Sequence, residues 1–199
     1  MEMDVAPSSK GTPDPALGGA MSQDDVRIVI VCTGNLCRSP MGEAMLRGAL
    51  AAKECERVRV SSSGTWAMFG NPATSDAIAT VKARGMELDA HRSRPVDIKE
   101  LIEADLVLAM TSVHLREIEE LAPEAAGKVR LVKELREIKV GVVEGSPKER
   151  IQALLRAPRP PRRRSLDLDD PMGLPASAYE RAAAELEAGL EVLASLICD

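Results

Sequence analysis

Short apolar runs rich in β-branched residues alternate along the chain with stretches of helical spacing. The strand-like runs are Val26–Val31, Val58–Ser62, Leu106–Ala109 and Val129–Val132. The stretches with helical spacing are Pro40–Ala52, Ala73–Arg84, Ser112–Leu121 and Ala176–Ile197. Strands that are separated by helices pair in parallel, with the helices covering both faces of the sheet. The pattern predicts an α/β fold, a three-layer sandwich on a four-stranded parallel sheet, which binds ligands beyond the carboxyl ends of its strands.

Composition narrows the class of protein further. A chain of 199 residues, 45% of them hydrophobic, suits one compact domain. The net charge is −5 and only three residues are aromatic, namely Trp66, Phe69 and Tyr179. Neither a basic surface nor stacking platforms for bases are therefore expected, which argues against nucleic acid as a partner. The apolar runs are too short to cross a membrane, so we expect no membrane partner.

The N-terminal region differs from the rest of the chain. Residues 1 to about 25 are rich in Ser, Gly, Pro and Ala, which predicts a disordered tail before a domain spanning residues 26–199. The start of the chain lacks the features of a signal peptide, so we expect a cytoplasmic protein. Its cysteines are then expected to be reduced thiols. The four cysteines are Cys32, Cys37, Cys55 and Cys198. Their spacing fits no common zinc site, so we expect no metal.

A basic, Pro-rich segment extends from residue 133 to about residue 168. Its most distinctive part is Pro158–Arg164, which holds four arginines. We expect an exposed and partly disordered insertion, with a short helix around Lys148–Leu155. The composition favours a solvated loop, and a docking patch for an acidic partner or substrate is the alternative.

The stretch between the first predicted strand and helix carries the chemistry. Cys32 is followed by five residues and then by Arg38. A loop of this length can curl around a tetrahedral oxyanion with its backbone N–H groups pointing inward, and the helix that follows directs the positive end of its dipole there. Arg38 adds a planar fork of donors that matches two phosphate oxygens. Gly34 permits tight curvature and Asn35 tolerates a left-handed backbone.

The same positive field favours an ionised sulfur on Cys32, which would make it a nucleophile. Ser39 is placed to donate a hydrogen bond to this sulfur and help it leave an intermediate. A single free cysteine is more often a buried, inert thiol, and a single arginine more often forms a surface ion pair. The combination of both at this spacing, with Gly and Asn between them, favours a phosphate loop.

The segment Val31–Pro40 resembles the signature of the low-molecular-weight protein tyrosine phosphatases, a family that also contains protein arginine phosphatases. Further similarities lie in Ser61–Thr65, His91–Arg94, Ala104–Met110 and Asp170–Pro171. The resemblance extends from about Val26 to Leu196, and the basic insertion is the main departure. It implies a flavodoxin-like phosphatase fold, a phosphorylated protein as substrate, no cofactor, and a monomer or weak dimer.

The resemblance also implies a mechanism. Cys32 attacks phosphorus, Arg38 and the loop amides stabilise the oxygens, and Asp170 protonates the leaving group and then helps to activate water. Asp169 is adjacent, but the family places its acid directly before proline. The expected substrate-binding residues are Thr33, Gly34, Asn35, Leu36, Cys37, Ser39 and Trp66.

Other residues receive supporting or alternative roles. The resemblance implies that Asn35 and His91 hold the loop geometry, although His91 could equally be an ordinary surface or capping histidine. His114 lies on a predicted polar helix and is expected to be exposed to solvent. Cys37 is implied to form a reversible disulfide with Cys32 under oxidation, and a small packing residue is the alternative. Cys55 and Cys198 receive no function.

The side chain that carries the phosphate is the least determined feature. Leu36 offers an apolar wall to an aromatic ring, where arginine-specific members of the family tend to carry threonine. Against this, no aromatic follows Asp170, and residues 63–73 resemble the arginine-phosphatase branch. Trp66 could stack on either substrate, and core packing is its alternative. We favour phosphotyrosine as the substrate, with phosphoarginine as the alternative. Two other functions are less favoured, namely an arsenate reductase and a non-catalytic phosphate-binding module.

Overall fold

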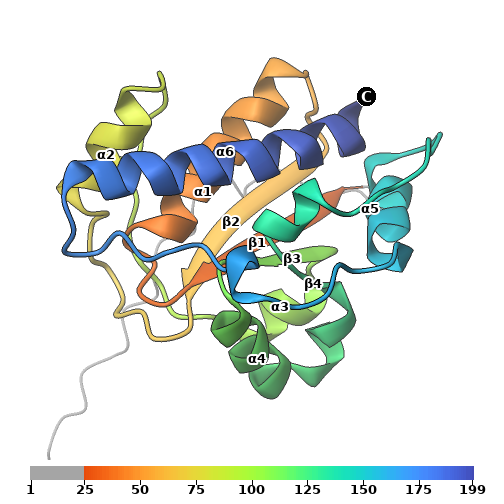
Figure 1. The fold of residues 1–199 in the computed structure, drawn as a ribbon, viewed down its shortest axis with the longest axis horizontal. Helices are drawn as coiled ribbons and strands as arrows, with labels where there is room; N and C mark the ends of the chain where they lie inside the picture. The colour runs from red at the N-terminus through yellow and green to blue at the C-terminus, as the bar shows by residue number, and fades with distance from the viewer. Residues whose placement is uncertain (1–24) are drawn as a thin grey trace, which may run out of the picture.

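The computed structural model describes residues 25–199, so the predicted tail lies outside the described residues except for its last residue. The fold is built on one parallel sheet (Figure 1). Its strands are β1 (Val26–Cys32), β2 (Val58–Gly64), β3 (Leu106–Ala109) and β4 (Val129–Leu131). They lie in the order β2-β1-β3-β4, and all neighbours are parallel. The predicted four-stranded α/β fold is confirmed.

Six α-helices connect and cover these strands in the described part of the chain. They are α1 (Arg38–Ala52), α2 (Ser75–Lys82), α3 (Ile98–Glu103), α4 (Ser112–Leu121), α5 (Pro147–Arg156) and α6 (Ala176–Cys198). Short 3₁₀ helices are η2 (Pro123–Lys128), η3 (Lys133–Arg136) and η4 (Arg164–Leu166). The four long predicted helices are present, with ends shifted by a few residues. α3 was not predicted, because its six residues are too few to show a helical period.

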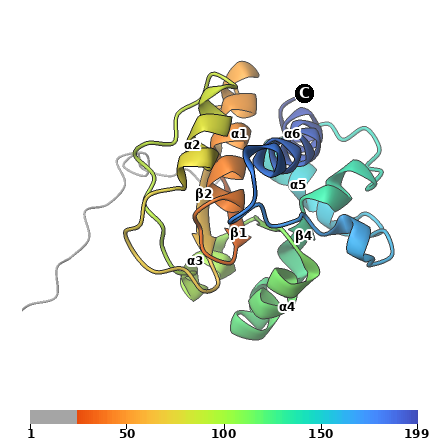
Figure 2. The same cartoon turned by 60° about the vertical axis from the view of Figure 1, so that its left-hand side comes forward.

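The core divides into two layers, one on each face of the sheet. Successive residues of a strand point to opposite faces. Ile28 and Ile30 accordingly join the cluster under α1, α2 and α6, whereas Val29 and Val31 join the cluster under α3 and α4. Figure 2 shows α1 and α6 together on one face of the sheet, with α4 beyond the other. This arrangement is the predicted three-layer sandwich, and it places the carboxyl ends of β1 and β2 at one edge.

The basic segment is more ordered and more buried than its composition suggests. The predicted short helix is present as α5, which begins with a capping box between Ser146 and Glu149. Ile151 and Leu154 on its inner face are buried, so the expectation of an exposed segment is wrong for them. Their three-residue spacing places both on the face that packs on the core. Within Pro158–Arg164, Arg162, Arg163 and Arg164 are exposed as the composition predicts, whereas Arg159 is half-buried and pairs with the buried Glu134 at 3.0 Å.

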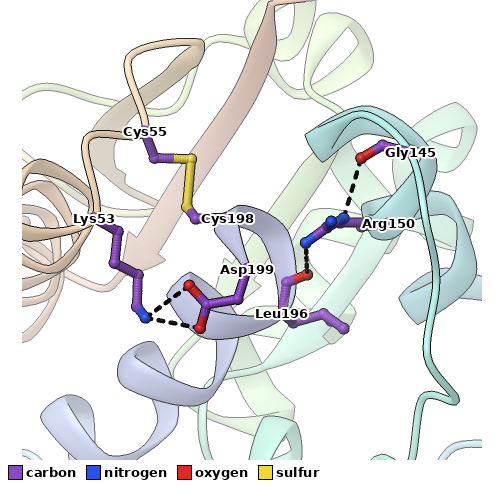
Figure 3. Close-up of a disulfide and its surroundings, with 7 residues drawn as sticks. All are labelled: Lys53, Cys55, Gly145, Arg150, Leu196, Cys198 and Asp199. Carbon is purple, nitrogen blue, oxygen red and sulfur yellow. Dashed lines mark hydrogen bonds and ion pairs between the residues drawn. A yellow bond between two sulfur atoms is a disulfide. The ribbon is translucent and has the colours of Figure 1, made fainter.

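A disulfide links the end of α6 to the loop after α1 (Figure 3). Cys55 and Cys198 are bonded, with their Cα atoms 5.8 Å apart. The expectation that all four cysteines are reduced thiols is therefore wrong for this pair. α6 packs along α1, so its last turn ends beside the residues that precede β2. Lys53 and Asp199 form an ion pair of 2.9 Å next to the bond.

Candidate active site

The sulfur of Cys32 lies at the end of β1, where the chain turns into the segment Cys32–Ser39, here called the anion loop. Cys32 is only 2% exposed, and its Sγ lies 3.0 Å from Ser39 Oγ. The backbone N–H of Asn35 donates to the same sulfur at 3.3 Å. The amide donates to the sulfur and the hydroxyl is within reach to do so, and such donors stabilise negative charge on a sulfur. The structure thus brings Cys32, Asn35 and Ser39 together, as the sequence predicts.

The backbone of the anion loop presents unused donors. Within residues 25–199, no hydrogen bond engages the N–H groups of Gly34, Leu36 and Cys37. Asn35 has a φ of 53°, the left-handed conformation that the sequence suggested. α1 begins at Arg38, within the last two residues of the loop, so the N-terminal end of its dipole lies next to these donors. Such a concavity of amides is suited to bind an oxyanion.

The side chain of Asn35 holds the loop in this shape. Its Nδ2 donates to Ser39 Oγ and to Ser62 Oγ, both at 2.9 Å, and its Oδ1 accepts from Arg94 N at 2.9 Å. Its backbone oxygen lies 2.8 Å from His91 Nε2. Burial lowers the pKa of His91, which favours the neutral imidazole. Asn35 is fully buried and well satisfied, so any relaxation of the loop would break several hydrogen bonds at once.

Gly64, at the end of β2, allows the anion loop to approach the sheet closely. A Cβ atom at this position would overlap the backbone oxygen of Thr33 and lie 2.9 Å from Asn35 N. The backbone N–H of Thr65 donates to Cys32 O at 2.9 Å. The Ser-Ser-Ser-Gly-Thr motif therefore forms the floor of the loop. The sequence marked this motif by resemblance but did not reveal that contact.

Arg38 and Asp170 meet over the anion loop. Arg38 is 4% exposed; its Nη2 lies 2.5 Å from Asp170 Oδ2, and its Nη1 donates to Leu168 O at 3.3 Å. The Asp170 side chain is 48% exposed, so it remains accessible to a ligand. Asp169 is exposed and has no ion pair within residues 25–199. The structure therefore brings Asp170, and not its neighbour, to the arginine.

His114 is the clearest error of the sequence-based prediction. It is 3% exposed, not solvent-exposed, and its Nε2 lies 2.8 Å from Thr33 Oγ1. Its Nδ1 lies 2.9 Å from Thr111 Oγ1. Burial, and then the charge of Arg38, lower the pKa of His114 to about 4. The imidazole is consequently neutral at physiological pH, and it orients the first side chain after the cysteine. The signal that could have revealed it is the four-residue spacing to buried Ile118.

Cys37 serves as a packing residue in the structure. Its Sγ lies 3.5 Å from Thr74 Oγ1 and 3.5 Å from Tyr179 Oη, which ties the anion loop to α2 and α6. Burial raises the pKa of Cys37. Cys32 and Cys37 are both free thiols here. Their oxidative pairing stays a prediction.

Four apolar residues lie within the anion loop or in the segments that the family resemblance marked. Leu36 is half-buried against the main core, and Met172 and Leu174 are half-exposed after Asp170. Trp66 is 75% exposed, so core packing is not its role; its Nε1 donates to Glu117 Oε1 at 2.9 Å. These residues could contact an aromatic substrate group.

A cavity of about 730 Å³ adjoins the anion loop. Its lining includes Thr33 and Arg38 of the anion loop and three exposed arginines of the basic segment. No group of three or more His, Cys, Asp or Glu residues suited to a metal occurs within residues 25–199. In the same range, no helix has the length and apolar character needed to span a membrane.

Comparison with known proteins identifies related phosphatases. Residues 27–144 match the model of the family described as low molecular weight phosphotyrosine protein phosphatase. The protein-tyrosine-phosphatase Etp of Escherichia coli K12 is 38% identical over 104 residues, which are 52% of this chain and 67% of that one. A protein-arginine-phosphatase of Geobacillus stearothermophilus is 35% identical over 168 residues, 84% of this chain and 93% of that one.

A solved structure also matches the fold. The low molecular weight protein tyrosine phosphatase of T. tengcongensis superimposes with a TM-score of 0.66 and 32% identity. The match covers 85% of this chain and 97% of the other.

Proposed function

Because the chain belongs to the low-molecular-weight phosphotyrosine protein phosphatase family and is a phosphoric monoester hydrolase, we propose that it hydrolyses phosphotyrosine in proteins through a cysteinyl-phosphate intermediate. One observation carries the proposal. The sulfur of Cys32 lies among converging donors, beside the only arginine of the anion loop and the carboxylate of Asp170. Nucleophile, oxyanion donors and acid thus occupy a single site.

In the first step, the thiolate of Cys32 attacks phosphorus opposite the ester oxygen. A sulfur–phosphorus bond forms, the phosphorus–oxygen bond breaks, and the carboxylic acid of Asp170 gives its proton to the departing oxygen. The free amides of the anion loop and the guanidinium of Arg38 stabilise the equatorial oxygens. In this account, Arg38 exchanges its contact with Asp170 for the phosphoryl group.

In the second step, water attacks the cysteinyl phosphate. The carboxylate of Asp170 takes a proton from the water, inorganic phosphate forms, and the electron pair of the broken bond returns to Cys32 as a thiolate. Ser39 Oγ, at 3.0 Å, donates a hydrogen bond to the departing sulfur. This contact lowers the cost of placing negative charge on a buried atom.

Three apolar residues support phosphotyrosine as the substrate. Leu36 is a half-buried apolar residue within the anion loop, and Met172 and Trp66 add exposed apolar surface. An aromatic ring gains free energy from such contacts, whereas a guanidinium requires polar partners.

Phosphoarginine is the second candidate substrate. The arginine phosphatase of G. stearothermophilus matches 84% of this chain, whereas Etp matches 52%. Asp169, exposed beside Asp170, is a carboxylate within the cavity that could receive a guanidinium.

The substrate is tested by comparing kcat/KM for two peptides that differ only in carrying phosphotyrosine or phosphoarginine. We expect the higher value for phosphotyrosine, and a shift toward phosphoarginine in the Leu36→Thr variant. A higher value for phosphoarginine in the wild type would select the second candidate. An unchanged ratio in the variant would show that Leu36 does not select the substrate.

Hydrolysis itself is tested with p-nitrophenyl phosphate. The wild type should hydrolyse it and Cys32→Ser should not. Binding of phosphate without hydrolysis of any aryl or arginyl phosphate would favour a non-catalytic module. Arsenate reduction would need further thiols near Cys32. Cys55 and Cys198 are instead joined in a disulfide. That bond lies near the start of β2, whereas Cys32 lies at the opposite end of the sheet.

A further inference from the structure

Three consecutive arginines, Arg162, Arg163 and Arg164, line the cavity beside the anion loop. We propose that Arg162 and Arg164 bind acidic side chains that flank the phosphorylated residue of a protein substrate. The inference rests on the proposed function, because it describes the surroundings of the residue that Cys32 attacks.

The cavity connects the arginines to the reacting group. Its lining includes Thr33, Arg38 and Asp170 at the anion loop and the three arginines, which are here called the rim. Its volume is about 730 Å³. In the proposed complex, a peptide whose phosphorylated side chain enters the anion loop extends through this cavity. The side chains of its neighbouring residues then pass the rim.

Two of the three arginines are available to a ligand. Arg163 donates to both carboxylate oxygens of Glu137, at 2.5 and 2.6 Å, and is therefore engaged. Arg164 is exposed and has no ion pair within residues 25–199. Arg162 has one contact of 3.3 Å with Glu119, and its side chain is 52% exposed. An exposed pair of this kind adds little stability, so a substrate carboxylate can replace it.

The chain that carries these arginines is held in place. Leu166 and Leu168 are buried, and Leu168 N donates to Met110 O at 2.8 Å. Between them, Asp167 Oδ1 accepts from Ser112 N at 2.7 Å, at the start of α4. A rim fixed before binding loses little entropy when the substrate arrives, which favours selective recognition.

The rim is locally positive on a chain whose net charge is −5. The carboxylates that share the cavity are mostly engaged, since Asp167 bonds to α4 and Asp170 pairs with Arg38. Asp169 alone is exposed without an ion pair in the described range. Together Arg162 and Arg164 outweigh this single charge, so the rim attracts acidic flanks and repels basic ones.

The test compares two phosphotyrosine peptides with either glutamate or glutamine at the flanking positions. The Kd of each peptide is measured on the Cys32→Ser protein, because this change prevents turnover. The measurement is repeated on the same protein with the added double change Arg162→Gln/Arg164→Gln, the rim variant. Arg156→Gln/Arg181→Gln is the matched control, because both residues are exposed, lie outside the cavity and change the net charge equally. The same ratio of glutamate to glutamine peptide is then measured as kcat/KM in proteins that retain Cys32.

We expect the glutamate peptide to bind about three- to tenfold more tightly, with less advantage at high salt. The rim variant should reduce this ratio to about one, and the control should retain it. Equal Kd values for the two peptides, no binding of either, or an undiminished ratio in the rim variant would overturn the inference. The protein could hydrolyse no phosphopeptide and still bind the glutamate peptide more tightly in a way that needs Arg162 and Arg164. In that case the proposed function fails and the inference about the two arginines stands.

Discussion

The two ends of the sheet use the same residue type in opposite ways. At the carboxyl end, Cys32 and Cys37 are free thiols in the anion loop. At the end where the strands begin, Cys55 and Cys198 are joined in a disulfide. A sulfur that must attack phosphorus cannot remain bonded, whereas a bonded pair can only restrain the chain. The comparison indicates that the protein separates its chemistry from its covalent restraint by the length of the sheet.

The two ends also differ in what remains unsatisfied. The anion loop keeps amide donors without acceptors and a sulfur surrounded by hydrogen bonds, at a cost in folding that a bound oxyanion would offset. The disulfide end is closed by the bond and by the ion pair of Lys53 with Asp199. Changes to the reacting groups at the first end should therefore affect turnover, and loss of the disulfide at the second should affect stability.

Asp170→Asn should give the largest effect, on turnover. The asparagine cannot donate or accept the proton, so we expect kcat to fall by about 10²- to 10⁴-fold, with phosphate binding retained. Asp169→Asn is the matched control, because it makes the same change in the adjacent residue. Steady-state kinetics with p-nitrophenyl phosphate measure both variants. Equal losses in the two would remove Asp170 from its assigned role.

Cys198→Ser should act on stability and leave the chemistry intact. Loss of the cross-link between residues that lie 143 positions apart should lower the free energy of unfolding by about 2–4 kcal/mol. Denaturant unfolding measures the loss, and kcat of the folded variant should match the wild type. With a reductant present, both proteins should unfold alike. A large fall in kcat would contradict the separation of the two ends.

His114→Gln should change how stability depends on pH. In the folded protein the pKa of His114 is about 4, below its ordinary value of 6.5. Between these pH values His114 is therefore protonated in the unfolded chain and neutral in the folded protein. Its contribution is therefore lost as pH falls from about 6.5 to 4, by roughly 2–3 kcal/mol. The free energy of unfolding is measured at pH 7 and at pH ~4.5 for both proteins. The difference between the two pH values should be smaller in the variant than in the wild type by that amount. His91, whose pKa is also lowered, keeps a residual dependence of the same sign; an unchanged slope would count against this assignment.

Ser39→Ala should give the smallest of these effects. It removes the donor to the departing sulfur, so breakdown of the cysteinyl phosphate should slow by about tenfold. Ser63→Ala is a matched control, since the buried Ser63 hydroxyl has no hydrogen-bond partner in the described chain. Pre-steady-state bursts separate formation from breakdown. A burst followed by an unchanged steady rate in Ser39→Ala would show that the hydroxyl does not assist.

Much of the fold could be predicted because the local pattern already determines it. The apolar run Leu106–Ala109 and the helical spacing of Ser112–Leu121 correspond to β3 and α4 without change. The anion loop could be predicted for the same reason, since Cys32 and Arg38 are close in sequence and lie between a strand and a helix.

What could not be predicted depends on distant packing. The approach of Cys55 to Cys198 follows from how α6 lies on α1, which no local pattern shows. The polar helix around His114 predicts an exposed side chain, although the side chain is buried and bonds to Thr33. The basic segment predicts its short helix, α5, but its composition does not reveal that Ile151 and Leu154 on that helix are buried.

The most direct test of the account is to locate the phosphoryl group during turnover. Protein mixed rapidly with p-nitrophenyl phosphate, quenched in acid and analysed by peptide mass spectrometry should carry phosphate on Cys32 alone. The amount should match the burst of nitrophenol. A burst without phosphate on Cys32, or phosphate on another residue, would contradict the claim that this sulfur is the nucleophile.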